Sequence, residues 1–371
     1  MSEELYVGTR KGLFILEQNE EDWSIKRHEF PGEPVSMIMP DPRDGMLYAA
    51  LTHGHFGAKL HRSADSGESW EECGLPTYPE TAETESVVAE TTGEKPKGDS
   101  LEEIWAMEPG SGSRLWAGTI PGGLFYSDDQ GTNWQLVESL WNDPQRPQWM
   151  GGGKDHAGLH SICVDPRNPD RITVAVSVGG VWQTNDGGTS WDLIGEGLRA
   201  EYMPPDQASS LLMQDPHLLV HCPASPDHMW IQHHNGIFRS ENGGLNWSEI
   251  TDVDPAVFGF AVAVHPDKPD LAWFVPAIKD ETRIPFQGEF VVTRTQDGGK
   301  SFDKLTSGLP QNNAFDIVYR HALAVDPIGT TLAMGSTTGN LWISQNSGDD
   351  WKSISNHLPP VYCLKFNPTR N

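Results

Sequence analysis

The sequence predicts an all-β fold made of seven repeated four-stranded units. Three observations support this: an eight-residue pattern recurs six times, short apolar segments precede each copy, and 38 Gly and 28 Pro are scattered along the chain as in a series of short strands and turns. The 14 Trp, 13 Phe and 7 Tyr supply material for a large core. We therefore expect residues 1–371 to form a single domain.

The recurring pattern has Ser or Thr at its first position, Asp or Asn at its third, Gly at its fifth and an aromatic residue at its eighth. The copies end at Trp70, Trp134, Trp191, Trp247, Phe302 and Trp351. The third-position side chain can accept hydrogen bonds from nearby backbone N–H groups, and the Gly can adopt the positive φ of a tight turn. The pattern therefore predicts a hairpin whose apolar side is covered by the aromatic ring.

Three short apolar segments precede each hairpin in most repeats, for example the segments at 160–166, 172–177 and 179–184. Successive aromatic residues of the pattern lie 49 to 64 residues apart. This period fits a four-stranded antiparallel unit with the pattern in the turn between the third and fourth strands. Such units are typical of the blades of a β-propeller.

The two ends of the chain supply one further blade. Residues 5–30 contain three apolar segments and a degenerate copy of the pattern that retains Trp23. The missing innermost strand is expected at residues 361–368, which follow the last complete blade. Pairing of the two ends closes the ring and removes exposed strand edges. The prediction is a seven-bladed β-propeller closed by the C-terminal strand joining the N-terminal blade.

One segment does not follow the repeat. Residues 76–103 contain eight acidic residues against Lys95 and Lys97 and have no periodic apolar face. They are expected to form an acidic surface loop between the second and third blades. Two interpretations stay open: a lid over the propeller axis, or a solvated insertion without a role.

Charge and composition exclude several classes of protein. The formal net charge of −26 argues against nucleic acid and anionic membrane as partners, because both require a positive surface. No apolar run reaches the roughly 18 to 20 residues of a membrane span, and the N-terminus lacks a secretory layout, so a cytoplasmic location is expected. Four cysteines without a CxxC pair indicate no disulfide scaffold. No phosphate-binding loop motif is present, so no nucleotide cofactor is expected.

The six patterns resemble the Asp-box, or BNR, repeats of sialidases, xyloglucan-degrading enzymes, sortilin and a photosystem II assembly factor. With the segments GTRKGLF and QHHNGIFRS between them, the chain resembles a sialidase-like bacterial family described as BNR-repeat glycosyl hydrolases. The resemblance implies Asp-box hairpins in a propeller and a glycoside hydrolase or related activity. Sialidases carry an Arg-Ile-Pro motif ahead of their first box and have six blades. Here Arg283-Ile284-Pro285 lies between the fourth and fifth boxes, so sialic acid is not the expected substrate.

The functional face is expected opposite the boxes, at the mouth of the central channel. The loops between second and third strands and between successive blades meet there, and loops on a rigid scaffold commonly carry function. Eight of the 14 histidines fall in these loops or beside them: His53, His55, His156, His160, His217, His233, His234 and His321. They come from at least five blades, so an axial pocket can collect several of them.

One interpretation of these histidines is a divalent metal site. His217, His234 and His160 are the candidate ligands, because neutral imidazoles together with a carboxylate bind zinc and other first-row ions. Their spacing matches no HExxH-like signature. The residues alone therefore leave the metal as one of two alternatives.

The other interpretation is metal-free acid and base chemistry on a polar or anionic ligand. Glu281, His156, His321 and Asp215 are the candidate catalytic residues. A glycosidase needs two facing carboxylates roughly 5 to 9.5 Å apart. The candidate substrate-binding residues are Arg10, Arg283, Arg320, Tyr202, His53 and His233. The arginines can clamp a carboxylate or phosphate, although the charged segment 279–285 is equally well explained as a self-paired turn.

The leading hypothesis is an enzyme that acts by hydrolysis or elimination on a small polar ligand, most simply a carbohydrate. The alternative is a propeller without catalytic activity that serves as a platform for a protein or peptide. A platform should present aromatic and aliphatic anchors, whereas these loops present His, Arg and acids. The sequence does not indicate an oligomeric state.

Overall fold

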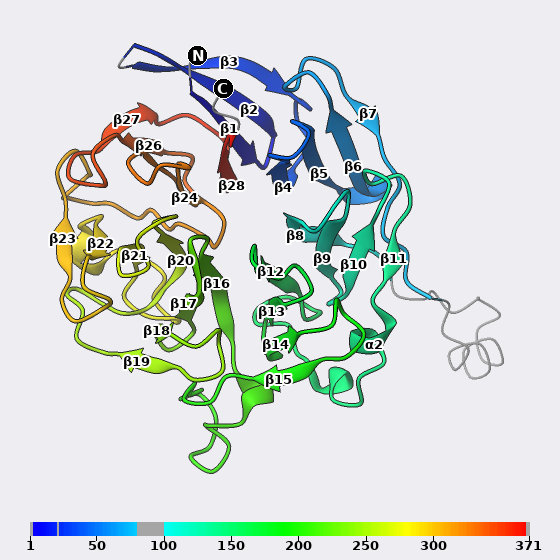
Figure 1. The fold of residues 1–371 in the computed structure, drawn as a ribbon. Helices are drawn as coiled ribbons and strands as arrows, with labels where there is room; N and C mark the ends of the chain where they lie inside the picture. Colours follow the sequence, from blue (N-terminus) through cyan, green and yellow to red (C-terminus); the bar gives the residue numbers. More distant parts are fainter. Residues whose placement is uncertain (1–2, 21, 80–99, 369–371) are drawn as a thin grey trace.

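The computed structural model describes residues 3–20, 22–79 and 100–368, and it shows a ring of seven four-stranded sheets around a central channel (Figure 1). In each sheet the neighbouring strands pair antiparallel. The predicted all-β, seven-bladed propeller is confirmed. None of the helices in these ranges has the length and apolar character needed to cross a membrane.

In each blade the strand numbers rise from the innermost strand outward, except that β28 (Val361–Phe366) is the innermost strand of the first blade. The first four blades comprise β28, β1 (Glu4–Thr9), β2 (Gly12–Asn19) and β3 (Asp22–Glu29); β4 (Val35–Pro40), β5 (Leu47–His53), β6 (Gly57–Ser63) and β7 (Glu71–Glu72); β8 (Glu103–Pro109), β9 (Leu115–Ile120), β10 (Leu124–Ser127) and β11 (Gln135–Leu136); and β12 (Leu159–Val164), β13 (Ile172–Val176), β14 (Gly180–Thr184) and β15 (Asp192–Ile194).

The remaining three blades follow in chain order. They comprise β16 (Pro216–Cys222), β17 (Ser225–His233), β18 (Ile237–Ser240) and β19 (Ser248–Ile250); β20 (Gly259–Val264), β21 (Ala272–Pro276), β22 (Val292–Thr295) and β23 (Asp303–Leu305); and β24 (Leu323–Val325), β25 (Leu332–Gly335), β26 (Leu341–Ser344) and β27 (Lys352–Ser355). Short helices lie in the connections: α2 (Glu138–Trp141) and the 3-10 turns η1 (Gly54–Phe56), η2 (Arg146–Gln148), η3 (Leu211–Met213) and η4 (Phe286–Gly288).

The ring is closed by strands from opposite ends of the chain. β28 pairs antiparallel with β1, with Leu5 opposite Phe366 and Gly8 opposite Cys363, and the two described ends lie in the same blade (Figure 1). The Sγ of Cys363 would contact a Cβ on Gly8 at 2.5 Å, so glycine permits this close approach. The predicted composite first blade is confirmed.

Each eight-residue box lies in the turn between the third and fourth strands of its blade. In the fourth blade Thr184 Oγ1 donates to Asp186 Oδ1 at 2.7 Å and accepts the N–H of Gly188 at 3.0 Å. Asp186 Oδ1 also accepts the N–H of Ser190 at 2.9 Å, and Gly188 has a φ of 94°. The conserved chemistry of the pattern therefore satisfies the turn's own backbone donors.

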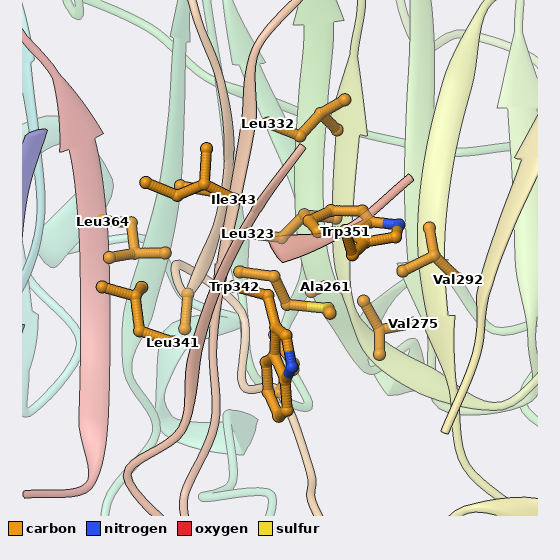
Figure 2. Close-up of a cluster of buried hydrophobic side chains, with 14 of the residues drawn as sticks. Ala261, Val275, Val292, Leu323, Leu332, Leu341, Trp342, Ile343, Trp351 and Leu364 are labelled. Atoms are coloured by element: carbon orange, nitrogen blue, oxygen red, sulfur yellow. The ribbon is translucent and has the colours of Figure 1, made fainter. Parts of the chain in front are cut away.

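Apolar side chains fill the space between neighbouring sheets. Figure 2 shows one such cluster, in which Leu323 and Leu332 of the last blade lie among side chains from the blades on either side, including Val275 and Leu364. The box residue Trp351 is 4% exposed within it. This continuous packing makes the ring a rigid support for the loops at either end of the channel.

The predicted acidic loop is described only at its two flanks, because residues 80–99 lie outside the described residues. Tyr78 is buried and its hydroxyl lies 2.7 Å from Thr119 Oγ1 in the third blade. The sequence predicts that Glu103 belongs to this loop, because its neighbours are acidic. In the structure Glu103 is instead the first residue of the inner strand β8. The four cysteines are all free thiols, as expected.

Candidate functional site

The inner strands share an irregularity where each begins at the channel mouth. In six blades the pairing with the second strand skips one or two residues, so that a side chain leaves the regular alternation of the strand. Such bulges commonly re-aim side chains beside binding sites. The skipped positions include Ser36, Trp105, His160, His217, Phe260 and Tyr362. His321 lies at the matching position of the last blade, and we call these seven residues the mouth ring.

A cavity of about 430 Å³ opens within this ring. Its volume falls in the usual range of small-ligand pockets. Four aromatic residues line it: Trp105, Phe260, Tyr319 and Tyr362. The ionisable residues that line it are Glu103, Lys154, Arg283, Arg320 and His321. The mouth is therefore locally basic although the chain carries a net charge of −26.

Arg320 differs from the other cations of this cavity because it has no carboxylate partner. Among the described residues no salt bridge includes it, and its Nε is buried without a hydrogen bond. Its guanidinium carbon lies 4.7 Å from the Trp105 ring and 5.7 Å from the Phe260 ring. Burial lowers the pKa of Arg320 to about 10, so the side chain stays charged at neutral pH.

The other two cations are already paired. Lys154 Nζ lies 3.1 Å from Glu103 Oε2, and the Nε of Arg283 donates to Asp280 Oδ1 at 3.0 Å. Glu103 is the only carboxylate among the described residues that line the cavity. Arg320 is therefore the cation of this lining that has no carboxylate within salt-bridge distance among the described residues, although Asp215 and Glu103 act on it from farther away.

A second cluster lies directly behind the cavity wall. Asp215, His217 and His234 each place one ligand atom within 4.8 Å of the other two. The Asp215 Oδ2 atom lies 3.2 Å from His234 Nδ1 and 3.8 Å from His217 Nε2. His217 stacks on Phe260 with ring centroids 4.5 Å apart, and a Cβ on Gly152 would lie 3.1 Å from Asp215 Oδ2. Phe260 and Gly152 thus separate this cluster from the cavity.

The electrostatics of the cluster follow from its burial. Asp215 is 4% exposed, which raises its pKa, but the His234 hydrogen bond and the neighbouring His217 and Arg320 outweigh burial and hold the pKa well below its usual range. Burial lowers the pKa of His217 to about 4. The cluster therefore contains a buried carboxylate and a neutral buried imidazole at physiological pH.

Three further predicted residues lie inside the protein. His233 is fully buried, and its Nε2 faces the backbone N–H of Asp215 at 3.1 Å. His160 is fully buried beside Ser161, and its Nε2 has no hydrogen-bond partner. His321 lines the cavity, and its Nε2 donates to the His160 carbonyl at 2.9 Å. Of these three only His321 contacts the cavity, and burial lowers its pKa to about 3.

The other predicted residues lie outside the cavity lining. Glu281 is exposed and pairs with Lys279 at 3.2 Å, which is the self-paired turn considered from the sequence. His156 is exposed and pairs with Glu102 at 2.7 Å. Arg10 is exposed. His53 lies 3.8 Å from Glu33, and Tyr202 donates from its hydroxyl to the Met213 carbonyl while its ring contacts His234.

The sequence interpretation missed the aromatic lining and the position of the mouth ring. A signal was present: the mouth-ring residue stands six positions before a Pro in six of the seven blades, as in His160 with Pro166 and Phe260 with Pro266. Trp105 is the exception. Aligning the inner strands on that Pro would have identified the mouth-ring residue in six of the seven blades.

Comparison with known proteins finds xyloglucanases. A xyloglucanase of Acetivibrio thermocellus is 31% identical over 210 residues, which are 49% of this chain and 23% of that protein. An oligoxyloglucan-reducing end-specific xyloglucanase of Emericella nidulans is 32% identical over 93 residues, 25% of this chain and 10% of that protein. The matches thus cover less than a quarter of each relative's length. No family model matches the chain.

Solved structures agree on the fold. The GH74 xyloglucanase of Xanthomonas campestris has a TM-score of 0.63 at 19% identity, over 95% of this chain and 52% of that one. YCF48 bound to a D1 peptide has a TM-score of 0.52 at 15% identity, over 86% of this chain and 82% of that one. At these identities the likeness concerns the propeller architecture alone.

Proposed function

We propose that this protein is an enzyme that binds an acidic carbohydrate at the channel mouth and cleaves it by elimination. The observation that carries the proposal is the unpaired guanidinium of Arg320 on the cavity wall. A partly desolvated cation without a directly bonded carboxylate is costly, and a ligand carboxylate would compensate it through charge-assisted hydrogen bonds. Arg283, which also lines the cavity, adds a second cation.

The aromatic lining supports a sugar as the carrier of that carboxylate. Trp105, Phe260, Tyr319 and Tyr362 surround the cavity and offer ring faces and two phenol hydroxyls. Ring faces pack against the C–H faces of a pyranose, while hydroxyl groups bind its polar edge. The curated relatives, which are xyloglucanases, support a carbohydrate ligand independently.

Elimination is favoured over hydrolysis by the ionisable groups of the cavity. Two facing carboxylates are needed for ordinary glycoside hydrolysis, and Glu103 is the only described carboxylate in the lining. In the elimination, Arg320 neutralises the uronate carboxylate, and a base removes the proton from the adjacent carbon. The bond from the next carbon to the glycosidic oxygen then breaks, and the protonated base, directly or through water, returns its proton to that oxygen. The products are an unsaturated uronate and a free hydroxyl group.

His321 is the candidate base. Its Nε2–H donates to the His160 carbonyl, so the lone pair resides on Nδ1, and the low pKa keeps the ring uncharged at neutral pH. A pKa this low makes the imidazole a weak base in the empty cavity, so the proposed step requires the bound uronate carboxylate to raise the pKa of His321. His321→Gln is expected to lower kcat more than it raises KM.

Hydrolysis of a neutral glucan is the second candidate, and the sequence similarity to xyloglucanases favours it. A panel of uronate oligosaccharides and xyloglucan oligosaccharides separates the two. Elimination gives an ultraviolet-absorbing unsaturated product, whereas hydrolysis gives a new reducing end without that absorbance. Turnover of xyloglucan alone would overturn the elimination proposal, and binding of peptides with no turnover of either class would favour a platform.

A further inference from the structure

We propose that Asp215, His217 and His234 form a binding site for a divalent first-row transition-metal ion. Their ligand atoms lie within 4.8 Å of one another, although the three residues come from the loop before β16, from β16 itself and from the loop after β17. Two imidazoles and one carboxylate on one side of an ion are an established donor set for zinc and ferrous iron. The bulge at the start of β16 turns His217 toward the other two residues.

The first independent observation is the hydrogen bonding of His217. Its Nδ1 lies 2.7 Å from the Gly259 carbonyl oxygen and donates a proton to it. The lone pair therefore resides on Nε2, which faces the Asp215 carboxylate at 3.8 Å. A neutral imidazole lone pair and a carboxylate oxygen are both hydrogen-bond acceptors and have no proton to share. A cation between them would bind to both. Metal-bound histidines usually donate their second N–H to a backbone carbonyl or carboxylate in this way.

The second observation is an unsatisfied oxygen. Asp215 is 4% exposed, and its Oδ1 is buried and has no hydrogen-bond partner among the described residues. A buried carboxylate oxygen without a partner is costly. Coordination of a metal, or of a water molecule held by the metal, would satisfy it.

His234 has surroundings similar to those of His217, with one ring nitrogen facing the site and the other near a second acceptor. While its Nδ1 faces Asp215, its Nε2 lies 3.9 Å from Asp280 Oδ2, and a small rotation of the ring would allow a hydrogen bond. The His234 side chain is 23% exposed, whereas those of Asp215 and His217 are 5% and 3% exposed. An ion would therefore enter from the His234 side and keep open positions toward solvent.

The nitrogen-containing donor set also discriminates between metals. Calcium and magnesium prefer all-oxygen sites, whereas imidazole suits zinc, iron, cobalt and nickel. The inference rests on coordination chemistry and not on the carbohydrate proposal. If both hold, an ion behind Phe260 and Gly152 would add positive charge close to the anionic substrate.

The test measures metal binding by chelator-treated protein. We expect zinc chloride to bind at one ion per chain by isothermal titration calorimetry, and cobalt chloride to give the visible absorbance of a protein-bound ion. Asp215→Asn, His217→Gln and His234→Gln should each lower zinc affinity by more than 100-fold. Asp280→Asn should lower it about 10- to 100-fold, as expected for a residue that orients a ligand.

The matched control is His156→Gln. His156 forms an exposed pair with Glu102 at 2.7 Å on the same face, and no third ligand joins the pair in the part of the chain that the structure describes, so its loss should leave zinc affinity unchanged. Circular dichroism checks that each variant is folded. If the buried His217→Gln variant fails to fold, the variant at the more exposed residue, His234→Gln, decides the question.

Zinc affinity that is equal in the wild type and in a folded His234→Gln variant would overturn the metal site. So would one bound ion that disappears in His156→Gln. Neither result depends on turnover of any carbohydrate. Zinc binding without activity on uronates would instead leave the metal site standing and count against the proposed reaction.

Discussion

Replacement of Arg320 by Met should affect ligand binding and stability in opposite directions. The guanidinium carbon lies 4.7 Å from the Trp105 ring and 5.7 Å from the Phe260 ring, and its Nε is buried without a partner among the described residues. Methionine retains much of the apolar contact and removes a charge that no described carboxylate pairs with. Because replacing a buried charged group by an apolar one of similar volume is often neutral or stabilising, the free energy of unfolding should stay equal or rise.

The cost to binding follows from the same geometry. Truncating one partner of a desolvated, hydrogen-bonded charge pair costs about 2–5 kcal/mol. That range corresponds to a rise in Kd of about 30- to 5,000-fold. The expected loss applies to uronate oligosaccharides and not to their neutral counterparts, because the neutral sugars lack the carboxylate.

Isothermal titration calorimetry and urea denaturation measure the two quantities on the same protein. Arg199→Met is the matched control, since Arg199 is an arginine on the same face that pairs with Glu249 and does not line the cavity. Unchanged uronate affinity in a folded Arg320→Met variant would refute the assignment of Arg320 as the anion-binding group. A large loss of stability together with unchanged affinity would identify it as a purely structural residue.

Three further predictions concern the scaffold. Trp247→Ala should lower the free energy of unfolding by about 3–5 kcal/mol, measured by urea denaturation. It removes a box residue that is 5% exposed and whose indole N–H donates to the Gly244 carbonyl. A loss of less than about 1 kcal/mol would show that the box ring is dispensable. Hydrogen bonds from Ser190 and Ser301 lower the pKa values of Asp186 and Asp297 to about 2 from 3.8. The stability that these carboxylates contribute is therefore complete above pH 4 and should disappear as the pH falls from about 4 to 2. Asp186→Asn should flatten this part of a pH profile of thermal unfolding. Deleting residues 361–368 removes β28, whose four apolar residues are 0 to 6% exposed and contribute about 6–12 kcal/mol by burial. The deletion should therefore abolish the cooperative unfolding transition seen by calorimetry. A retained sharp transition would contradict closure of the ring by this strand.

The fold could be predicted because its signals are local. In each box the residues that identify the turn also make its hydrogen bonds, as Thr184 and Asp186 show, so the pattern and the structure have the same cause. Closure of the ring followed from counting strands at the two ends. The start of β8 was missed, because Glu103 stands in an acidic stretch whose composition resembles a loop although the residue begins a strand.

The site was only partly predictable because it depends on how loops return to the axis. His217, His234 and Asp215 were candidates and do lie together, whereas His156 was an equal candidate and pairs with Glu102 at the surface. No spacing rule in the sequence distinguishes these outcomes. The unpaired state of Arg320 was equally hidden, since it depends on where all the neighbouring carboxylates lie.

The bulge at the start of the inner strands allows the side chains at the channel mouth to differ without a change in the fold. The residue at the bulge is not paired with the neighbouring strand, so it contributes little to the hydrogen bonding that holds the blade together. It can therefore be replaced while the strand stays in place. Five of the seven positions line the cavity: Ser36, Trp105, Phe260, His321 and Tyr362. They form an interchangeable set of side chains around a shared opening, and the small Ser36 leaves room within it. Libraries restricted to these positions should therefore yield folded propellers with altered ligand preference at high frequency.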